Sequence, residues 1–182
     1  MIYAYYHRLT GAQKRAYRRS DEITTIRLPQ GEALRAMTGE LARALSKEDR
    51  GLTERLSQRL TSGITERLRA PTVRVEVLQV RPSNHSGELH GLYTPGQRNR
   101  PAHVRLWMRT AKRHQVVAFR TFLRTLLHEL CHHLDYEWFR LQDSFHTEGF
   151  YKRESSLVYQ LLEKDPDQHP PADQKVESES RS

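Results

Sequence analysis

The 182-residue sequence contains one cysteine, Cys131, so no disulfide can form within the chain. It also lacks any run of about 18 apolar residues, the length that a membrane-spanning helix needs. Residues 1–17 are rich in tyrosine and carry charges throughout, without the apolar stretch and small-residue cleavage site of a secretory signal. We therefore expect a soluble, cytoplasmic protein with no membrane association.

Acidic residues are in deficit, with 22 Asp and Glu against 30 Lys and Arg, which gives a net charge of +8. Basic chains tend to associate with nucleic acid or other polyanions. The arginines, however, are scattered from Arg8 to Arg181 and do not form one block, which is also typical of a solvated surface. The charge therefore leaves two interpretations open, DNA association and an ordinary arginine-rich surface.

Apolar residues in the segment 1–70 recur at spacings of three and four, the repeat of one helix face. The two stripes consist of Leu34, Met37, Leu41 and Leu45, and then Leu52, Leu56, Leu60, Ile64 and Leu68. The simplest interpretation is an N-terminal helical segment that packs on the rest of the chain. A helix pair that binds a partner and a regulatory or self-inhibiting segment are the alternatives.

The repeat changes after Pro71, which ends the helical region. Alternation of apolar and polar residues, with turn-forming clusters between, then predicts strands, and longer apolar stripes predict helices. The strands are expected at about residues 73–80, 88–93 and 104–108, and the helices at about 116–141 and 145–162. We predict an α+β fold with its core domain at residues 71–163. Residues 164–182 hold three prolines, many charges and almost no apolar residue, which predicts a disordered tail.

The most informative motif is the pentapeptide 128–132, His-Glu-Leu-Cys-His, an H-E-x-x-H pattern. Its helix has one apolar face, and His128, His132 and Asp135 fall within about 60° of one another on the opposite side. Residues four apart on a helix have Cβ atoms about 5–6 Å apart, so both imidazoles can reach one zinc ion at about 2.0–2.1 Å. Glu129 is rotated about 100° from His128 and can take the proton of a water at the open position of the metal.

The chain has ten histidines, so a chance match to this motif is the alternative to a metal site. The position of the motif on a well-defined helix that follows strands nevertheless favours a metal site. A catalytic zinc needs a third protein ligand. Thirteen residues separate His132 from His146, enough to end one helix and return over the metal with His146 in the first turn of the next. Glu148 is the rival ligand, and Asp135 is expected to orient a ligating imidazole or to ligate directly.

The neighbours of these residues have simpler interpretations. His133 points about 100° away from the histidine pair and is expected to be structural or exposed. Cys131 is expected to be a small buried apolar residue and not a ligand. Tyr151 and Arg153 follow His146 on the next helix, and each is a candidate for stabilising an oxyanion, although a surface or packing role is the simpler prediction.

At these residues the sequence resembles zincin metallopeptidases, and most closely the compact SprT-like and minigluzincin-type proteins. The resemblance covers about residues 71–162, from the strands through the H-E-x-x-H helix to the helix after it. In SprT-like proteins the third ligand is a histidine in a His-Gly motif followed by an aromatic residue. The segment 146–150, His-Thr-Glu-Gly-Phe, is similar, with its glycine three residues after the histidine. In gluzincins the third ligand is a glutamate, which keeps Glu148 as the alternative.

The resemblance implies a zincin-like core, in which a small mixed sheet lies over the active-site helix. It implies one zinc ion, held by His128, His132 and His146, and hydrolysis of a protein or peptide substrate with Glu129 as the general base. An edge strand at residues 103–109 would bind an extended peptide by main-chain pairing. SprT-like proteins are also associated with DNA and with cleaving proteins bound to it. The competing hypothesis is a basic, nucleic-acid-associated module whose zinc site is structural or vestigial.

Overall fold

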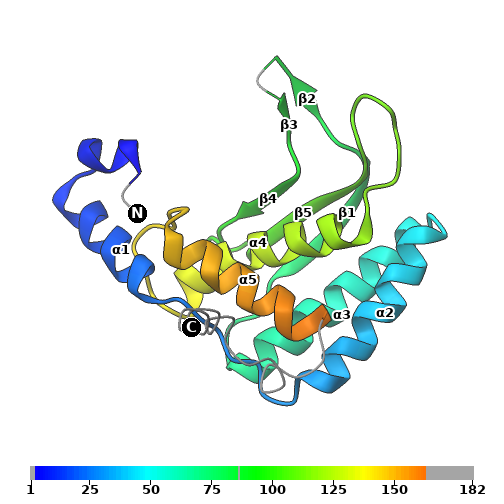
Figure 1. The fold of residues 1–182 in the computed structure, drawn as a ribbon, viewed down its shortest axis with the longest axis horizontal. Coiled ribbons are helices and arrows are strands. Elements are labelled where there is room, and N and C mark those ends of the chain that lie inside the picture. Colours follow the sequence, from blue (N-terminus) through cyan, green and yellow to red (C-terminus); the bar gives the residue numbers. More distant parts are fainter. Residues whose placement is uncertain (1–2, 86, 163–182) are drawn as a thin grey trace, which may run out of the picture.

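The structure, a computed structural model, describes residues 3–85 and 87–162 and combines helices with a small mixed sheet (Figure 1). A short 3-10 helix and three α-helices precede the sheet: η1 (Ala4–Arg8), α1 (Gly11–Glu22), α2 (Gly31–Ser46) and α3 (Arg50–Leu68). The α+β class is therefore confirmed, and the expected helical stripes of residues 34–68 lie on α2 and α3. The tail predicted at residues 164–182 lies outside the described residues.

Helices α2 and α3 pack against each other through their leucine stripes. Asp49 caps α3, since its side chain accepts a hydrogen bond from the Leu52 N–H at 2.8 Å. A Cβ at Gly63 would lie 2.8 Å from Leu34 Cδ2, so the absence of a side chain at Gly63 allows the two helices to approach closely. This contact explains a glycine that would otherwise weaken α3.

Three strands form the main sheet, in the order β1, β5, β4. β1 (Arg74–Val80) pairs parallel with β5 (His103–Arg109), and β4 (Gly91–Thr94) pairs antiparallel with the other side of β5. A second, two-stranded sheet is formed by β2 (Ser83–Asn84) and β3 (Gly87–Glu88). The prediction that residues 103–109 form an edge strand is wrong, because β5 has a partner on both sides. Alternation predicts that a strand exists but not its neighbours, which depend on tertiary pairing.

Two helices follow the sheet, α4 (Phe119–Glu137) and α5 (Glu148–Leu162), and both are shorter than predicted. Val117 remains extended because its N–H donates to the carbonyl of Met108 at 2.7 Å, which delays the start of α4. The start of α5 is fixed by Thr147, whose hydroxyl accepts a hydrogen bond from the Phe150 N–H at 3.0 Å, as an N-cap does.

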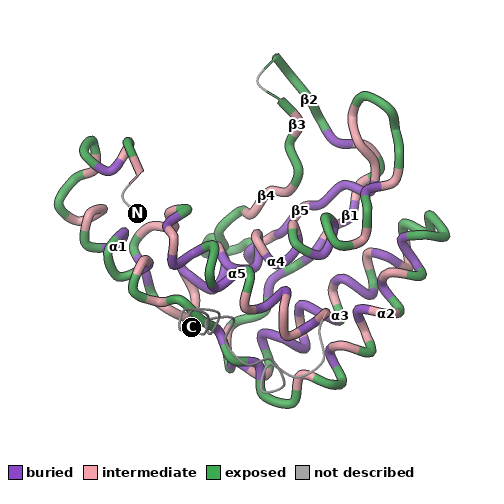
Figure 2. Tube along the Cα trace, in the orientation of Figure 1, coloured by how far each residue is buried: buried purple, intermediate pink, exposed green. Residues whose placement is uncertain are grey.

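Helices α2 to α5 and strands β1 and β5 share one apolar core, and the buried stretches concentrate on β5, on α4 and on the inner sides of α2 and α3 (Figure 2). Helix α4 contacts β4 and β5, while α3 contacts β1. Fully buried members come from each layer: Leu34, Leu60, Val77, Val104, Leu126 and Leu157. In the described part of the chain no helix has both the length and the apolar character to cross a membrane.

Candidate metal centre

Three imidazoles meet where α4 passes the loop before α5. His128 and His132 lie on consecutive turns of α4, and one nitrogen of each, together with one of His146, falls within a group of atoms no more than 4.8 Å apart. The Nε2 atom of His146 is 3.0 Å from the Nε2 atoms of both other histidines. A tetrahedral zinc with bonds of about 2.0–2.1 Å requires nitrogens about 3.3 Å apart. The three residues are therefore close enough to bind one metal ion.

The position of His146 differs in one respect from the prediction. It lies in the loop two residues before α5 begins at Glu148, and not in the first turn of that helix, because Thr147 caps the helix. Glu148 does not belong to the histidine group. Its carboxylate lies 2.8 Å from Nζ of Lys152, one turn further along α5. Of the two candidates for the third ligand, the fold brings His146 to the pair on α4.

The other ring nitrogen of His128 is held by a buried carboxylate. Nδ1 of His128 lies 2.8 Å from Oε2 of Glu154, and the second oxygen of Glu154 accepts a hydrogen bond from Arg124. Burial raises the pKa of Glu154, but the hydrogen bonds from His128 and Arg124 outweigh it and hold the pKa below its ordinary value. An ionised Glu154 only accepts hydrogen bonds, so Nδ1 of His128 carries the proton and Nε2 keeps its lone pair.

His132 is oriented in the same sense through a hydroxyl. Its Nδ1 atom lies 2.8 Å from Ser144 Oγ, and Ser144 Oγ donates its own hydrogen to Asp135 Oδ2 at 2.7 Å. The serine oxygen therefore accepts the Nδ1–H of His132, which again leaves Nε2 free. Asp135 thus acts on the imidazole from behind, through Ser144, and does not join the histidine group.

The donor set of this centre fits a cation. His146 has at most one Nε2–H to offer, yet its Nε2 faces two acceptor nitrogens, each at 3.0 Å. Burial, with the neighbouring His128 and His146, lowers the pKa of His132 to about 3, so this ring stays uncharged at neutral pH. Converging lone pairs without protons to fill them are stabilised by a metal ion such as Zn²⁺.

Glu129 lies beside the histidines on the side of β4. It is buried, and burial raises its pKa, although His128 and a hydrogen bond from the Tyr93 backbone act in the other direction. A Cβ at Gly91 would lie 2.6 Å from Glu129 Oε1, so only glycine lets β4 come this close. A pocket of about 500 Å³ opens here, lined in part by His128, Glu129 and Gly91. A carboxylate with a raised pKa in such a pocket is suited to proton transfer.

Tyr93 of β4 contacts both His132, a member of the histidine group, and His133, which lies behind it. Its ring stacks on His132 with centroids 6.4 Å apart, and its hydroxyl lies 3.3 Å from Nδ1 of His133. The other nitrogen of His133 lies 2.8 Å from the carbonyl of Pro71, so this fully buried histidine holds the chain between α3 and β1. Cys131 is also fully buried, and burial raises the pKa of its thiol well above the ordinary value, which suits a small apolar residue.

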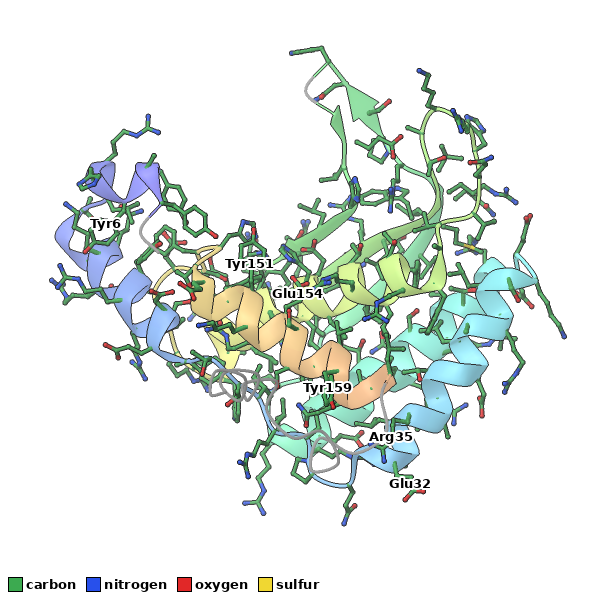
Figure 3. All side chains as sticks on the ribbon, in the orientation of Figure 1. Tyr6, Glu32, Arg35, Tyr151, Glu154 and Tyr159 are labelled. Atoms are coloured by element: carbon green, nitrogen blue, oxygen red, sulfur yellow. The ribbon has the colours of Figure 1, made fainter. Side chains whose placement is uncertain are left out.

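The two oxyanion candidates on α5 differ in position. Arg153 is fully buried, and its Nη2 atom donates to Asp135 Oδ1 at 2.7 Å, so it faces the interior and cannot contact a substrate. Tyr151 is 41% exposed, and its ring centroid lies 5.8 Å from that of His146. Tyr151 and Glu154 both lie on the N-terminal half of α5 (Figure 3). Tyr151 therefore remains accessible beside the histidines, whereas Arg153 does not.

Sequence reasoning did not identify Ser144 or Glu154 as partners of the histidines. Both are common polar residues on other elements, and only the packing of α5 and its preceding loop on α4 brings them to the rings. Comparison of the chain with models of protein families, with curated proteins and with solved structures gave no match. The resemblance to zincin metallopeptidases therefore rests on residues 128–132 and 146 and on the contacts around them.

Proposed function

We propose that this protein is a zinc-dependent metallopeptidase with a zincin-like core, in which His128, His132 and His146 hold one zinc ion. The observation that carries the proposal is the convergence of three Nε2 atoms beside the buried carboxylate of Glu129. Zinc at this position would polarise the carbonyl of a peptide bond and lower the pKa of a water molecule to about 7.

Glu129 is the general base of the proposed reaction. It accepts a proton from the attacking water and later passes it to the amine that leaves when the peptide bond breaks. Burial raises the pKa of this carboxyl toward neutrality, which makes both the uptake and the return of a proton easier near pH 7. Glu154 and Ser144 keep the rings of His128 and His132 in the orientation that presents Nε2.

The proposed substrate is an extended peptide bound along β4 (Gly91–Thr94), in place of the strand expected from the sequence. β4 is an edge strand whose one strand partner in the described part of the chain is β5, and Gly91 lies in contact range of Glu129. Main-chain pairing with such an edge supports binding of many sequences. Tyr151, whose pKa is raised by burial and which therefore stays protonated at neutral pH, is the proposed hydrogen-bond donor to the developing oxyanion.

A basic, nucleic-acid-associated module with a structural or vestigial zinc site is the second candidate function. It is favoured by a hollow of about 320 Å³ near the start of β5, whose lining includes three arginines: Arg74, Arg100 and Arg105. Arginines gathered around a hollow suit the phosphates of DNA. This surface and the net charge of +8 support DNA association either as the main role or as an addition to proteolysis.

Replacement of Glu129 separates the two candidates. The Glu129→Gln variant should keep one equivalent of zinc, measured by elemental analysis, but lose hydrolysis of an unfolded protein such as casein. The matched His132→Ala variant should lose both. A binding module would show no zinc-dependent hydrolysis in the wild-type protein, and its affinity for DNA, falling steeply with salt, would be the same in Glu129→Gln. Wild-type protein that contains zinc and cleaves neither casein nor short peptides contradicts the peptidase proposal.

A further inference from the structure

Arg153 joins the N-terminal helix α1 to the region of the metal centre. Its side chain is fully buried, and Nη1 donates hydrogen bonds to the carbonyls of Ser20 and Ile23, both at 2.6 Å. Nη2 donates to Ser20 Oγ at 3.0 Å and to Asp135 Oδ1 at 2.7 Å. Ser20 belongs to the last turn of α1, and Ile23 is the residue that ends it. One guanidinium therefore bridges the end of α1 and a carboxylate of α4.

A continuous chain of hydrogen bonds runs from α1 to a metal ligand. Beyond Asp135 it continues to Ser144 at 2.7 Å and then to Nδ1 of His132 at 2.8 Å. From this chain we infer that Arg153 is a positioning residue, which couples the docking of α1 to the metal affinity of His132. The inference rests on the metal centre of the proposed function.

The end of α1 is chemically suited to this contact. The last carbonyls of a helix lack partners within the helix and carry partial negative charge, so a cation there is favourable. The guanidinium is also covered by two aromatic rings, those of Phe139 and Phe150, with centroids 5.4 and 5.6 Å away. If α1 moves away, Arg153 loses three of its four hydrogen bonds, those to Ser20 and Ile23. Its ion pair with Asp135 is then no longer held in one orientation.

A second set of contacts ties α1 to the loop that carries His146. The N–H of Gly149 donates to Asp21 Oδ1 at 3.0 Å, and a Cβ at Gly149 would lie 2.5 Å from the carbonyl oxygens of Ser20 and Asp21. The hydroxyls of Ser20 and Thr147 are 3.3 Å apart. Figure 1 shows α1 beside the start of α5, in agreement with these contacts. Helix α1 is thus close-packed against Thr147 and Gly149, which follow His146, and it is hydrogen-bonded to Arg153, which pairs with Asp135.

Coupling between α1 docking and metal binding must act in both directions. Displacement of α1 loosens Asp135 and Ser144, so His132 loses its fixed orientation and the metal binds more weakly. A bound metal, in turn, favours the arrangement in which α1 is docked. The N-terminal helix is then a component of the metal centre, although none of its residues reaches the metal.

The coupling is tested in the full-length chain by measuring Zn²⁺ affinity in competition with a chelator and the visible spectrum of the Co²⁺-loaded protein. Arg153→Met should bind Zn²⁺ about 10- to 100-fold more weakly, the usual effect of removing a residue that supports a ligand. Arg153→Lys keeps the charge and should recover part of this loss. Gly149→Ala, which pushes α1 away and leaves the hydrogen-bonded residues intact, should also weaken binding and alter the Co²⁺ spectrum. Arg19→Gln, on the exposed side of α1, is the matched control and should change nothing.

Hydrogen–deuterium exchange of the wild-type protein gives a test that needs no variant. Addition of Zn²⁺ should increase protection of the backbone amides of Gly11–Glu22. Unchanged protection there, or wild-type Zn²⁺ affinity in folded Arg153→Met and Gly149→Ala proteins, would overturn the coupling and leave the metal centre in place. Failure of the wild-type protein to bind Zn²⁺ would instead remove the proposed function, and this inference with it.

Discussion

Gly91 and Glu129 lie so close that a side chain on the strand would collide with the carboxylate. A Cβ built at Gly91 falls 2.6 Å from Glu129 Oε1 and 2.8 Å from its Cγ. Such separations require either the strand or the glutamate to move. The edge strand and the proposed general base are therefore adjusted to each other, and a substrate paired to β4 would pass directly over Glu129.

Replacement of Gly91 by alanine should reduce peptidase activity without loss of metal. The added methyl group displaces Glu129 or β4, while the three histidines, which lie on α4 and the following loop, keep their contacts. Casein hydrolysis and zinc content would be measured on the same preparation. Gly39→Ala on α2 is the control for a glycine-to-alanine change away from the site, since a Cβ there meets only the end of the Arg43 side chain, at 3.7 Å. Full activity in Gly91→Ala would show that the close approach of strand and carboxylate has no role in catalysis.

The identity of the third ligand is tested by a pair of alanine variants. His146→Ala should lower zinc content to near zero or raise the dissociation constant by orders of magnitude, because two imidazoles alone hold zinc weakly. Glu148→Ala should bind zinc as the wild type does, since its carboxylate pairs with Lys152 and lies outside the histidine group. Elemental analysis after dialysis distinguishes the two. Loss of zinc in Glu148→Ala, with retention in His146→Ala, would assign the ligand to the glutamate.

The parts of this site that the sequence predicts are those encoded over short distances. The spacing of His128 and His132 is a property of one helix, and His146 is the next histidine in the chain after His133. The partners Glu154 and Ser144 depend on how α5 and its preceding loop pack on α4, and no periodic pattern records that packing. The same limit applies to the fold. Alternation of apolar and polar residues predicts the strand at residues 103–109 but not its central position between β1 and β4.

The carboxylate behind His128 should contribute to metal affinity without touching the metal. Glu154→Gln removes the negative charge that accepts the Nδ1–H of His128, so the imidazole becomes less basic and less well oriented. We expect Zn²⁺ affinity to fall about 10- to 100-fold. Chelator competition measures this, and Glu137→Gln, farther along α4, is the control. An unchanged dissociation constant in Glu154→Gln would mean that the contact orients the ring no better than water does.

Tyr151 should affect catalysis and not metal binding. Tyr151→Phe keeps the ring next to His146 and removes only the hydroxyl that is proposed to donate to the oxyanion. The expected result is a fall in kcat of about 100-fold, as for removal of one such donor, with little change in KM or in zinc content. Steady-state kinetics on a short fluorogenic peptide provide the measurement. A change in KM alone would assign the tyrosine to substrate binding.

The stability of the metal-free protein should fall as the pH decreases below neutrality. Burial lowers the pKa of His132 from 6.5 to about 3, and also lowers the pKa values of His133 and His146. Below pH 6.5 the unfolded chain therefore binds protons that the folded protein does not, and this favours unfolding. The stabilising effect of uncharged His132 is fully present above pH 6.5 and is lost as the pH falls toward 3, at about 1.4 kcal/mol per pKa unit.

Buried carboxyls with a raised pKa have the opposite effect on the free energy of unfolding, so the pH range of the measurement matters. The folded protein takes up protons on Glu129 and Asp135 before the unfolded chain does, which adds stability at acidic pH. The effect of the histidines is therefore measured between pH 8 and pH 6, by urea unfolding of the metal-free protein. The free energy of unfolding should decrease over this range, and the decrease should be smaller in His132→Asn. A free energy of unfolding that stays constant from pH 8 to pH 6 would mean that these imidazoles gain protons equally well in both states.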